Sequence, residues 1–88
     1  MVSKKVFVGN ASGLHLKPAA VLNEKALSYQ SLITFTHGKR TANAKSLLSV
    51  LGACVRGGEE IELVCIGEDE REALAGLSEI IEGGLGEK

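Results

Sequence analysis

The most constraining feature of this sequence is a short segment in which apolar and charged residues alternate. Ile61, Leu63 and Cys65 occupy every second position, and they alternate with Glu60, Glu62 and Val64. This period of two is typical of a strand with one apolar face and one polar face. An antiparallel sheet can keep its polar face in water while helices cover the other face. The segment therefore predicts a sheet that is packed on one side only.

Other segments extend this prediction to seven elements. Strand patterns, bounded by glycine and polar residues, alternate with segments in which apolar residues recur at helical spacing. The expected strands are residues 2–8, 32–36, 41–43 and 60–66, and the expected helices are residues 16–27, 47–51 and 69–81. The order is strand, helix, strand, strand, helix, strand, helix. It predicts the α+β class, with a four-stranded antiparallel sheet covered on one face by three helices.

Glycines mark two of the expected chain reversals. Gly38 stands at the first central position of the hairpin between residues 32–36 and 41–43, where a type II′ turn needs a positive φ. We expect the neighbouring His37 to be a surface hairpin residue and not a metal ligand. Two glycines at 83–84 end the last helix, and we expect a frayed tail after them.

Composition excludes several classes of function. The 88 residues have a formal net charge of −1, with one tyrosine, two phenylalanines and no tryptophan. Nucleic-acid binding needs clustered cations and stacking surfaces, which this composition does not supply. The sequence shows no apolar run of membrane-spanning length and no recognisable leader. We therefore expect a single domain over residues 1–88, in the cytoplasm, with no membrane insertion, no direct nucleic-acid contact and no cofactor.

The two cysteines, Cys54 and Cys65, lack the close spacing of zinc ligands or redox pairs. Both stand among apolar neighbours in the sequence. We expect both to be buried as small apolar side chains, with a disulfide or a reactive thiol as the alternative. No metal site is expected.

His15 carries the most chemistry in this sequence. It directly precedes the first expected helix, with Lys17 and Pro18 in the first turn. A neutral imidazole keeps a lone pair, and histidine forms covalent intermediates in group-transfer reactions. The unpaired backbone N–H groups of Leu16 and Lys17 would bind an anion at the helix N-terminus. Lys17 adds a positive charge, and Ser12 is placed to add a hydrogen bond.

The residues alone leave a second interpretation of His15 open. A histidine before a helix also serves as a simple helix cap or as a turn residue. The adjacent cation and proline favour the chemical interpretation without deciding between the two. From spacing alone, therefore, His15 remains either a phosphoryl acceptor or a structural residue.

Two motifs at their positions in this chain are distinctive. The first is Gly13-Leu14-His15-x-x-Pro18-Ala19-Ala20, and the second is Lys45-Ser46-Leu47 at the start of the second helix. The chain resembles the HPr family, the histidine-containing phosphocarriers of the bacterial phosphoenolpyruvate:sugar phosphotransferase system. The resemblance covers essentially the whole chain, including its length and element order. The segment Gly84-Leu85-Gly86-Glu87 further resembles HPr proteins of low-GC Gram-positive bacteria.

The resemblance implies an open-faced β-sandwich that acts as a carrier and not as an enzyme. His15 would accept a phosphoryl group on Nδ1 from enzyme I and give it to the IIA domains of sugar permeases. In the Gram-positive branch, Ser46 would be phosphorylated by HPr kinase/phosphorylase, and the modified protein would serve as corepressor for catabolite control protein. Without the resemblance, Ser46 is simply a helix N-cap.

The resemblance also implies a surface that docks partner proteins. Leu47, Leu48 and Leu51 would form an apolar patch, with Ala20 nearby. Since leucines at helical spacing can equally be core residues, we expect Val50 to face inward. Leu47 and Leu51 are expected to be at least partly exposed. The chain is expected to be a monomer.

Two residues depart from the family pattern. Lys17 stands where arginine is usual, and Leu16 replaces a small or polar residue. Lysine supplies a point charge, whereas arginine grips phosphate with two parallel hydrogen bonds. We therefore expect phosphorylation of His15 to be slower than with arginine at position 17.

Two other functions are compatible with the same motifs. The main alternative is a regulatory HPr-like interaction module that acts through Ser46 and uses His15 little. The presence of His15 favours the carrier over this module. The other alternative is the HPr-like part of another phosphorelay, with nitrogen-type or dihydroxyacetone-kinase partners.

Overall fold

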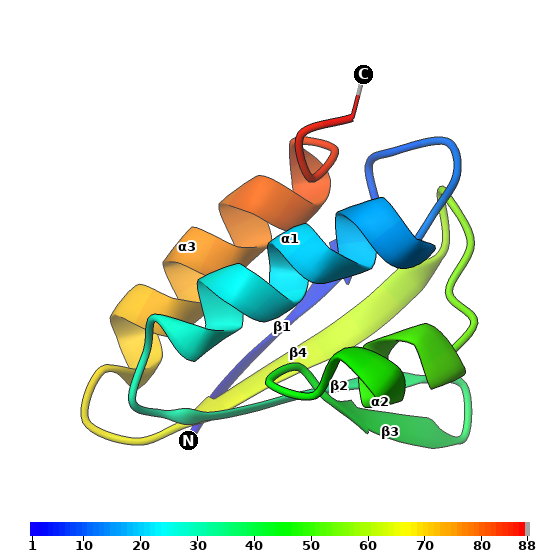
Figure 1. The fold of residues 1–88 in the computed structure, drawn as a ribbon. Coiled ribbons are helices and arrows are strands. Elements are labelled where there is room, and N and C mark those ends of the chain that lie inside the picture. The colour runs from blue at the N-terminus through cyan, green and yellow to red at the C-terminus, as the bar shows by residue number, and fades with distance from the viewer. Residues whose placement is uncertain (88) are drawn as a thin grey trace.

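Four strands and three helices make up the computed structural model, which describes residues 1–87 (Figure 1). In chain order the elements are β1 (Val2–Phe7), α1 (Leu16–Leu27), β2 (Leu32–His37), β3 (Arg40–Asn43), α2 (Leu47–Gly52), β4 (Glu60–Ile66) and α3 (Glu70–Glu82). The predicted order is confirmed, and every predicted boundary lies within one residue of the observed one.

The sheet has the strand order β1-β4-β2-β3, and all of its pairings are antiparallel. Val6 on β1 faces Ile61 on β4, and Phe35 on β2 faces Leu63 on β4. These four side chains are buried, whereas Glu62 is exposed. The alternation in β4 therefore corresponds to one covered face and one solvated face, as predicted.

The three helices lie on the same face of the sheet (Figure 1). α3 packs over β1 and β4, α2 packs over β3, and α1 contacts both of the other helices. Their apolar faces and the covered face of the sheet form one core, whose largest fully buried apolar side chains include Phe35, Leu22, Ile33, Ile61, Leu63, Leu77 and Ile81. Among the described residues, no helix is long and apolar enough to cross a membrane.

The buried face of α1 fixes where its N-terminus lies. Ala19, Leu22 and Ala26 are fully buried, as their spacing predicts. Tyr29 lies beyond the end of the helix and is only partly buried. Since three helical turns are packed against the core, the residue that precedes α1 is held at a defined point of the surface.

The hairpin between β2 and β3 contains Gly38 with the predicted positive φ, +62°. His37 pairs with Arg40 in this hairpin, and its side chain is partly buried, with 23% exposed. Its Nδ1 lies 3.0 Å from the Ala53 carbonyl oxygen, and its Nε2 lies 3.1 Å from Glu59 Oε1. His37 therefore joins the hairpin to the segment between α2 and β4. Within the described part of the chain, no cluster of three or more histidine, cysteine or acidic residues is placed to hold a metal ion.

The two cysteines are free and differ in their surroundings. Cys65 is buried as predicted, and burial, reinforced by nearby carboxylates, raises the pKa of its thiol to about 11. The prediction for Cys54 is wrong, because this residue is exposed. It has a φ of +54° just after α2, and its neighbours Ala53 and Val55 take the buried positions instead.

The segment after α3 is a second correction, because it is not a frayed tail. The Leu85 side chain is only 3% exposed, and its N–H donates to the Ile80 carbonyl oxygen at 2.8 Å. Gly84 has a φ of +97°, and its carbonyl accepts from the Glu87 N–H at 2.9 Å. Glycine at this position lets the chain turn back, so that Leu85 reaches the core. The segment lies next to the loop between β1 and α1 (Figure 1).

Candidate functional site

His15 is the N-cap of α1, as predicted. Its backbone is extended, with φ −87° and ψ −174°, and its side chain makes no capping hydrogen bond. The imidazole is half exposed. A ring that is accessible and not engaged in a cap can approach a group on another protein.

Backbone contacts hold the loop that precedes His15. The Leu14 N–H donates to the Val55 carbonyl oxygen at 2.9 Å, and the Leu14 side chain is buried. Gly13 has a φ of +70°, and a Cβ at this position would lie 2.4 Å from the Val55 carbonyl oxygen. The position of His15 therefore depends on a close approach that only glycine permits.

The first turn of α1 presents hydrogen-bond donors beside His15. The Ala19 N–H closes the first helical hydrogen bond, to the His15 carbonyl oxygen at 2.8 Å. The N–H groups of Leu16 and Lys17 come before it and have no acceptor within the helix. Pro18 has no N–H to leave unpaired. These donors and the positive end of the helix dipole have the chemistry that favours an anion.

Glu87 belongs to this site, and the sequence analysis did not predict it. Its Oε2 lies 3.1 Å from His15 Nε2, while its Oε1 accepts from Asn10 Nδ2 at 3.0 Å and from the Ser12 hydroxyl. The hydrogen bonds from Ser12, Asn10 and His15, in that order, lower the pKa of Glu87 to about 2. Glu87 is therefore ionised at neutral pH. With Lys17 it lines a cavity of about 210 Å³.

Asn10 is the second site residue that the sequence analysis missed. Its side chain is only 4% exposed, and Nδ2 also donates to the Gly13 carbonyl oxygen at 2.8 Å. Its Oδ1 is buried without a partner among the described residues. Asn10 and Glu87 are 77 positions apart, so no local pattern links them.

Ser46 is the N-cap of α2, as predicted. Its hydroxyl oxygen accepts from the Ser49 N–H at 3.3 Å. The residue is partly exposed. Ser46 therefore lies at the surface where α2 begins.

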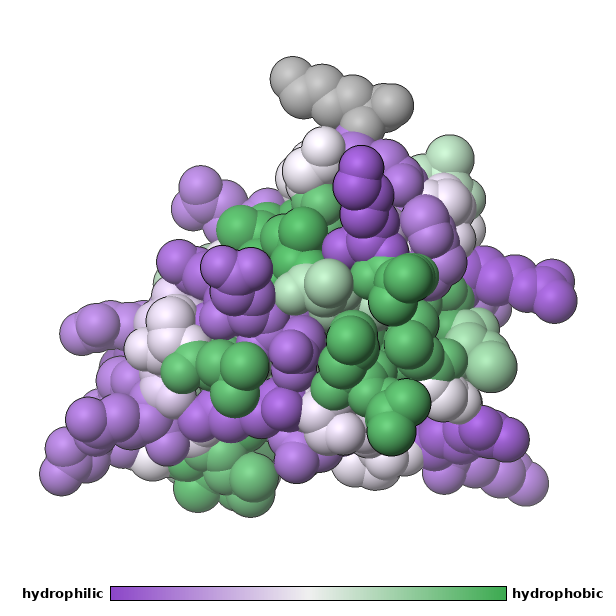
Figure 2. Space-filling model, in the orientation of Figure 1, coloured by the Kyte–Doolittle hydropathy of each residue, from purple (hydrophilic) through white to green (hydrophobic). Residues whose placement is uncertain are grey.

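The side chains of α2 divide as the sequence analysis predicts. Val50 is buried, Leu48 is 83% exposed, and Leu47 and Leu51 are partly buried against the core. Ala20 on α1 is also partly buried. Figure 2 shows apolar side chains gathered over α2 and the start of α1. An apolar surface thus lies beside the helix that His15 caps.

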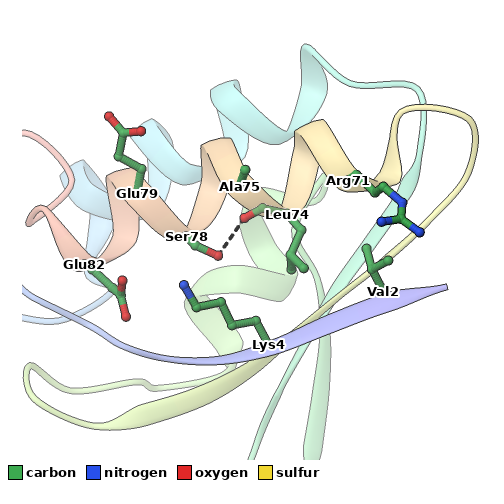
Figure 3. A pocket seen from close by; sticks show the side chains of 8 residues that line it. All are labelled: Val2, Lys4, Arg71, Leu74, Ala75, Ser78, Glu79 and Glu82. Atoms are coloured by element: carbon green, nitrogen blue, oxygen red, sulfur yellow. Dashed lines mark hydrogen bonds between the residues drawn. The ribbon is translucent and has the colours of Figure 1, made fainter.

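The largest cavity described lies elsewhere. It is a groove of about 610 Å³ between β1 and α3 (Figure 3). Lys4 extends into it from β1, and Glu82 flanks it on α3 (Figure 3). The Ser78 hydroxyl in this groove already donates to the Leu74 carbonyl oxygen at 2.6 Å. Cavity size therefore does not locate the histidine site.

Known proteins match this chain over nearly its full length. A family model described as the PTS HPr component phosphorylation site matches residues 2–83. The phosphocarrier protein HPr of Treponema pallidum is 35% identical over 82 residues, 93% of each chain. The HPr-like protein Crh of Bacillus subtilis is 34% identical, over 93% of this chain and 96% of its own. A crystal structure of HPr-C-His from Thermoanaerobacter tengcongensis has a TM-score of 0.95 at 32% identity, covering 100% of this chain and 99% of the other.

The family model and the relatives named phosphocarrier protein define the class of this fold, a phosphocarrier domain and not an enzyme. The chain belongs to the HPr family of the phosphotransferase system. The predicted resemblance and fold are thus confirmed. HPr and Crh relatives match this chain almost equally well. Sequence identity therefore does not distinguish a phosphocarrier from a regulatory HPr-like protein, and the residues of the site have to be considered.

Proposed function

We propose that this protein accepts a phosphoryl group on Nδ1 of His15 from phosphorylated enzyme I and passes it to sugar-specific IIA domains. The observation that carries the proposal is the position of His15. Its half-exposed imidazole stands at the N-terminus of α1, in front of the N–H groups of Leu16 and Lys17. These donors would stabilise the phosphoryl oxygens during transfer.

Two successive transfers test this function. The protein is incubated with enzyme I and phosphoenolpyruvate, and a IIA domain is added afterwards. We expect an acid-labile, base-stable phosphate on His15 that leaves the protein as the IIA domain becomes labelled. No acceptance from an enzyme I that phosphorylates another HPr would contradict the carrier function. That result would favour a regulatory interaction module that acts through Ser46.

Lys17 is proposed to neutralise the charge of the phosphoryl group and to contribute to partner choice. Its side chain is exposed, next to Pro18 and near Glu87 in the small cavity. An ammonium group there supplies charge without the paired hydrogen bonds of a guanidinium group. The geometry of the phosphorylated state is therefore less constrained than with arginine.

Lys17→Arg is expected to increase the rate of phosphorylation by enzyme I about three- to tenfold, because bidentate hydrogen bonds to phosphate are stronger than a point contact. The rate is measured at limiting enzyme I. Lys25→Arg makes the same change on the same helix, where Lys25 lies over the Tyr29 ring, and is expected to leave the rate unchanged. A Lys17→Arg variant no faster than wild type would contradict this role.

We also propose regulatory phosphorylation of Ser46 by an ATP-dependent HPr kinase/phosphorylase, with the modified protein acting on catabolite control protein. The partly exposed hydroxyl at the N-cap of α2 supports this proposal. A phosphate adds about −1.5 to −2 charges beside the positive end of a helix, where it does not oppose folding. It would instead change the surface that partners contact.

Ser46→Ala is expected to lose all modification by the kinase while still accepting phosphate on His15. Loss of the N-cap hydrogen bond should cost about 1 kcal/mol of unfolding free energy. Ser3→Ala on β1, an exposed serine, serves as the control and should still be modified. Continued ATP-dependent phosphorylation of Ser46→Ala would rule out this site.

The partner surface is proposed to consist of Ala20, Leu47, Leu48 and Leu51. The high exposure of Leu48 supports this assignment, since a large apolar side chain in water gains by docking. A phosphate on Ser46 would lie at the edge of this surface, where acidic partners repel it. We propose that the protein acts as a monomer in the cytoplasm and needs no cofactor.

A further inference from the structure

The contact between Glu87 and His15 determines which ring nitrogen carries the proton. Glu87 Oε2 lies 3.1 Å from His15 Nε2, and a carboxylate can only accept a hydrogen bond. Nε2 must therefore be the donor. A neutral imidazole has a single N–H, so Nδ1 then holds the lone pair.

Nδ1 is available to use that lone pair. The His15 side chain makes no hydrogen bond that caps α1, and the ring is half exposed. The tautomer that Glu87 selects is therefore the one in which Nδ1 can act as a nucleophile. The Glu87 carboxylate contacts Nε2 and therefore leaves Nδ1, the reacting atom, free of this contact.

The Glu87 carboxylate is itself held in place. Oε1 accepts from Asn10 Nδ2 at 3.0 Å and from the Ser12 hydroxyl. The buried Asn10 amide is fixed by its hydrogen bond to the Gly13 carbonyl oxygen at 2.8 Å. The buried Leu85 anchors the chain two residues before Glu87. The carboxylate is thus placed before any partner binds, which lowers the cost of using it during transfer.

We propose that Glu87 is a positioning residue for phosphoryl transfer, which keeps the proton of His15 on Nε2 so that Nδ1 attacks. Asn10 and Ser12 hold Glu87 in this position. The inference rests on the proposed function, because it requires His15 to be the phosphoryl acceptor. It assigns a role to two side chains, Asn10 and Glu87, that lie outside the two motifs around His15 and Ser46.

The transfer step balances without the movement of a proton. The Nδ1 lone pair forms the bond to phosphorus, while the bond to the donor breaks and its electron pair stays on the donor. The His15 ring then carries phosphorus on Nδ1, a proton on Nε2 and a positive charge that faces the Glu87 carboxylate. In onward transfer, the acceptor's lone pair attacks phosphorus and the N–P electron pair returns to Nδ1.

Glu87→Ala is expected to slow the phosphorylation of His15 by enzyme I about tenfold, the effect of losing a hydrogen bond to a charged group at a partly exposed site. Glu82→Ala is the matched control. It removes the same charge from the exposed end of α3 and should react at the wild-type rate. A Glu87→Ala variant that reacts as fast as wild type, or faster, would overturn the proposal.

Nitrogen NMR of the unphosphorylated ring gives a readout that a purely structural role would not change. At a pH where the ring is neutral, wild type and Glu82→Ala should show the proton on Nε2 alone. Glu87→Ala should show a measurable Nδ1–H fraction, and an unchanged tautomer in this variant would overturn the proposal. If wild type accepts no phosphate, the proposed function fails, while the NMR comparison still decides whether Glu87 sets the tautomer.

Discussion

His15→Ala is expected to abolish phosphoryl acceptance from enzyme I and phosphoenolpyruvate completely. Alanine has no lone pair to attack phosphorus. Glu87, Asn10 and Ser12 contact the imidazole or one another, and none of them supplies a nitrogen nucleophile in its place. The fold should remain, because the ring is half exposed and makes no capping hydrogen bond. We expect the unfolding free energy to change by less than about 1 kcal/mol. Labelled phosphate and thermal unfolding measure the two effects separately.

The second histidine of the chain supplies a matched control. His37 contacts Glu59 and the Ala53 carbonyl oxygen, and neither of these contacts involves His15 or Glu87. His37→Ala should therefore keep full phosphoryl acceptance while losing some stability. Base-stable phosphate on His15→Ala, or its loss from a folded His37→Ala, would contradict the assignment of His15.

Gly13→Ala is expected to lower the unfolding free energy by about 3 kcal/mol or more and to slow phosphoryl acceptance. The residue has a φ of +70°, and the new Cβ would lie 2.4 Å from the Val55 carbonyl oxygen and 2.6 Å from Arg56 Cα. Both are backbone atoms, so no side chain can rotate away. The loop before His15 must move, and His15 with it. Urea unfolding and the enzyme I assay measure the two losses.

Gly38→Ala separates backbone strain from the clash. Gly38 also has a positive φ, +62°, but a Cβ there would meet nothing within 4 Å. The unfolding free energy should therefore fall only by the cost of placing alanine in a left-handed conformation, about 1 kcal/mol. The described side-chain contact of His15 is with Glu87 and not with the hairpin, so phosphoryl acceptance should be normal. Equal losses of stability in the two variants would show that the contact with Val55 is unimportant.

The sequence predicts the fold well where its patterns are local. The alternation in β4 required one covered face and one solvated face, and the register opposite β1 and β2 has that arrangement. The helical spacing of Ala19, Leu22 and Ala26 predicted the buried face of α1. Both patterns arise because one face of each element is buried, so apolar residues recur with the period of that strand or helix.

The parts of the site that the sequence did not predict depend on contacts between distant residues. Glu87 meets His15 across 72 positions of the chain. The glycines after α3 indicated where the helix ends, yet they equally allow the turn that buries Leu85. A large apolar residue between glycines is the signal that could have indicated an anchored segment. The prediction for Cys54 was wrong because it rested on the apolar neighbours, and the structure buries Ala53 and Val55 and leaves Cys54 exposed.

The most direct measurement is NMR of the protein after reaction with enzyme I and phosphoenolpyruvate. Phosphorus–nitrogen correlations identify the atom to which phosphorus is bonded, and removal by acid but not by base identifies the bond type. We expect phosphorus on Nδ1 of His15, with a proton retained on Nε2 beside Glu87. Phosphorus on any other residue, or none from an enzyme I that phosphorylates a known HPr, would contradict the carrier mechanism.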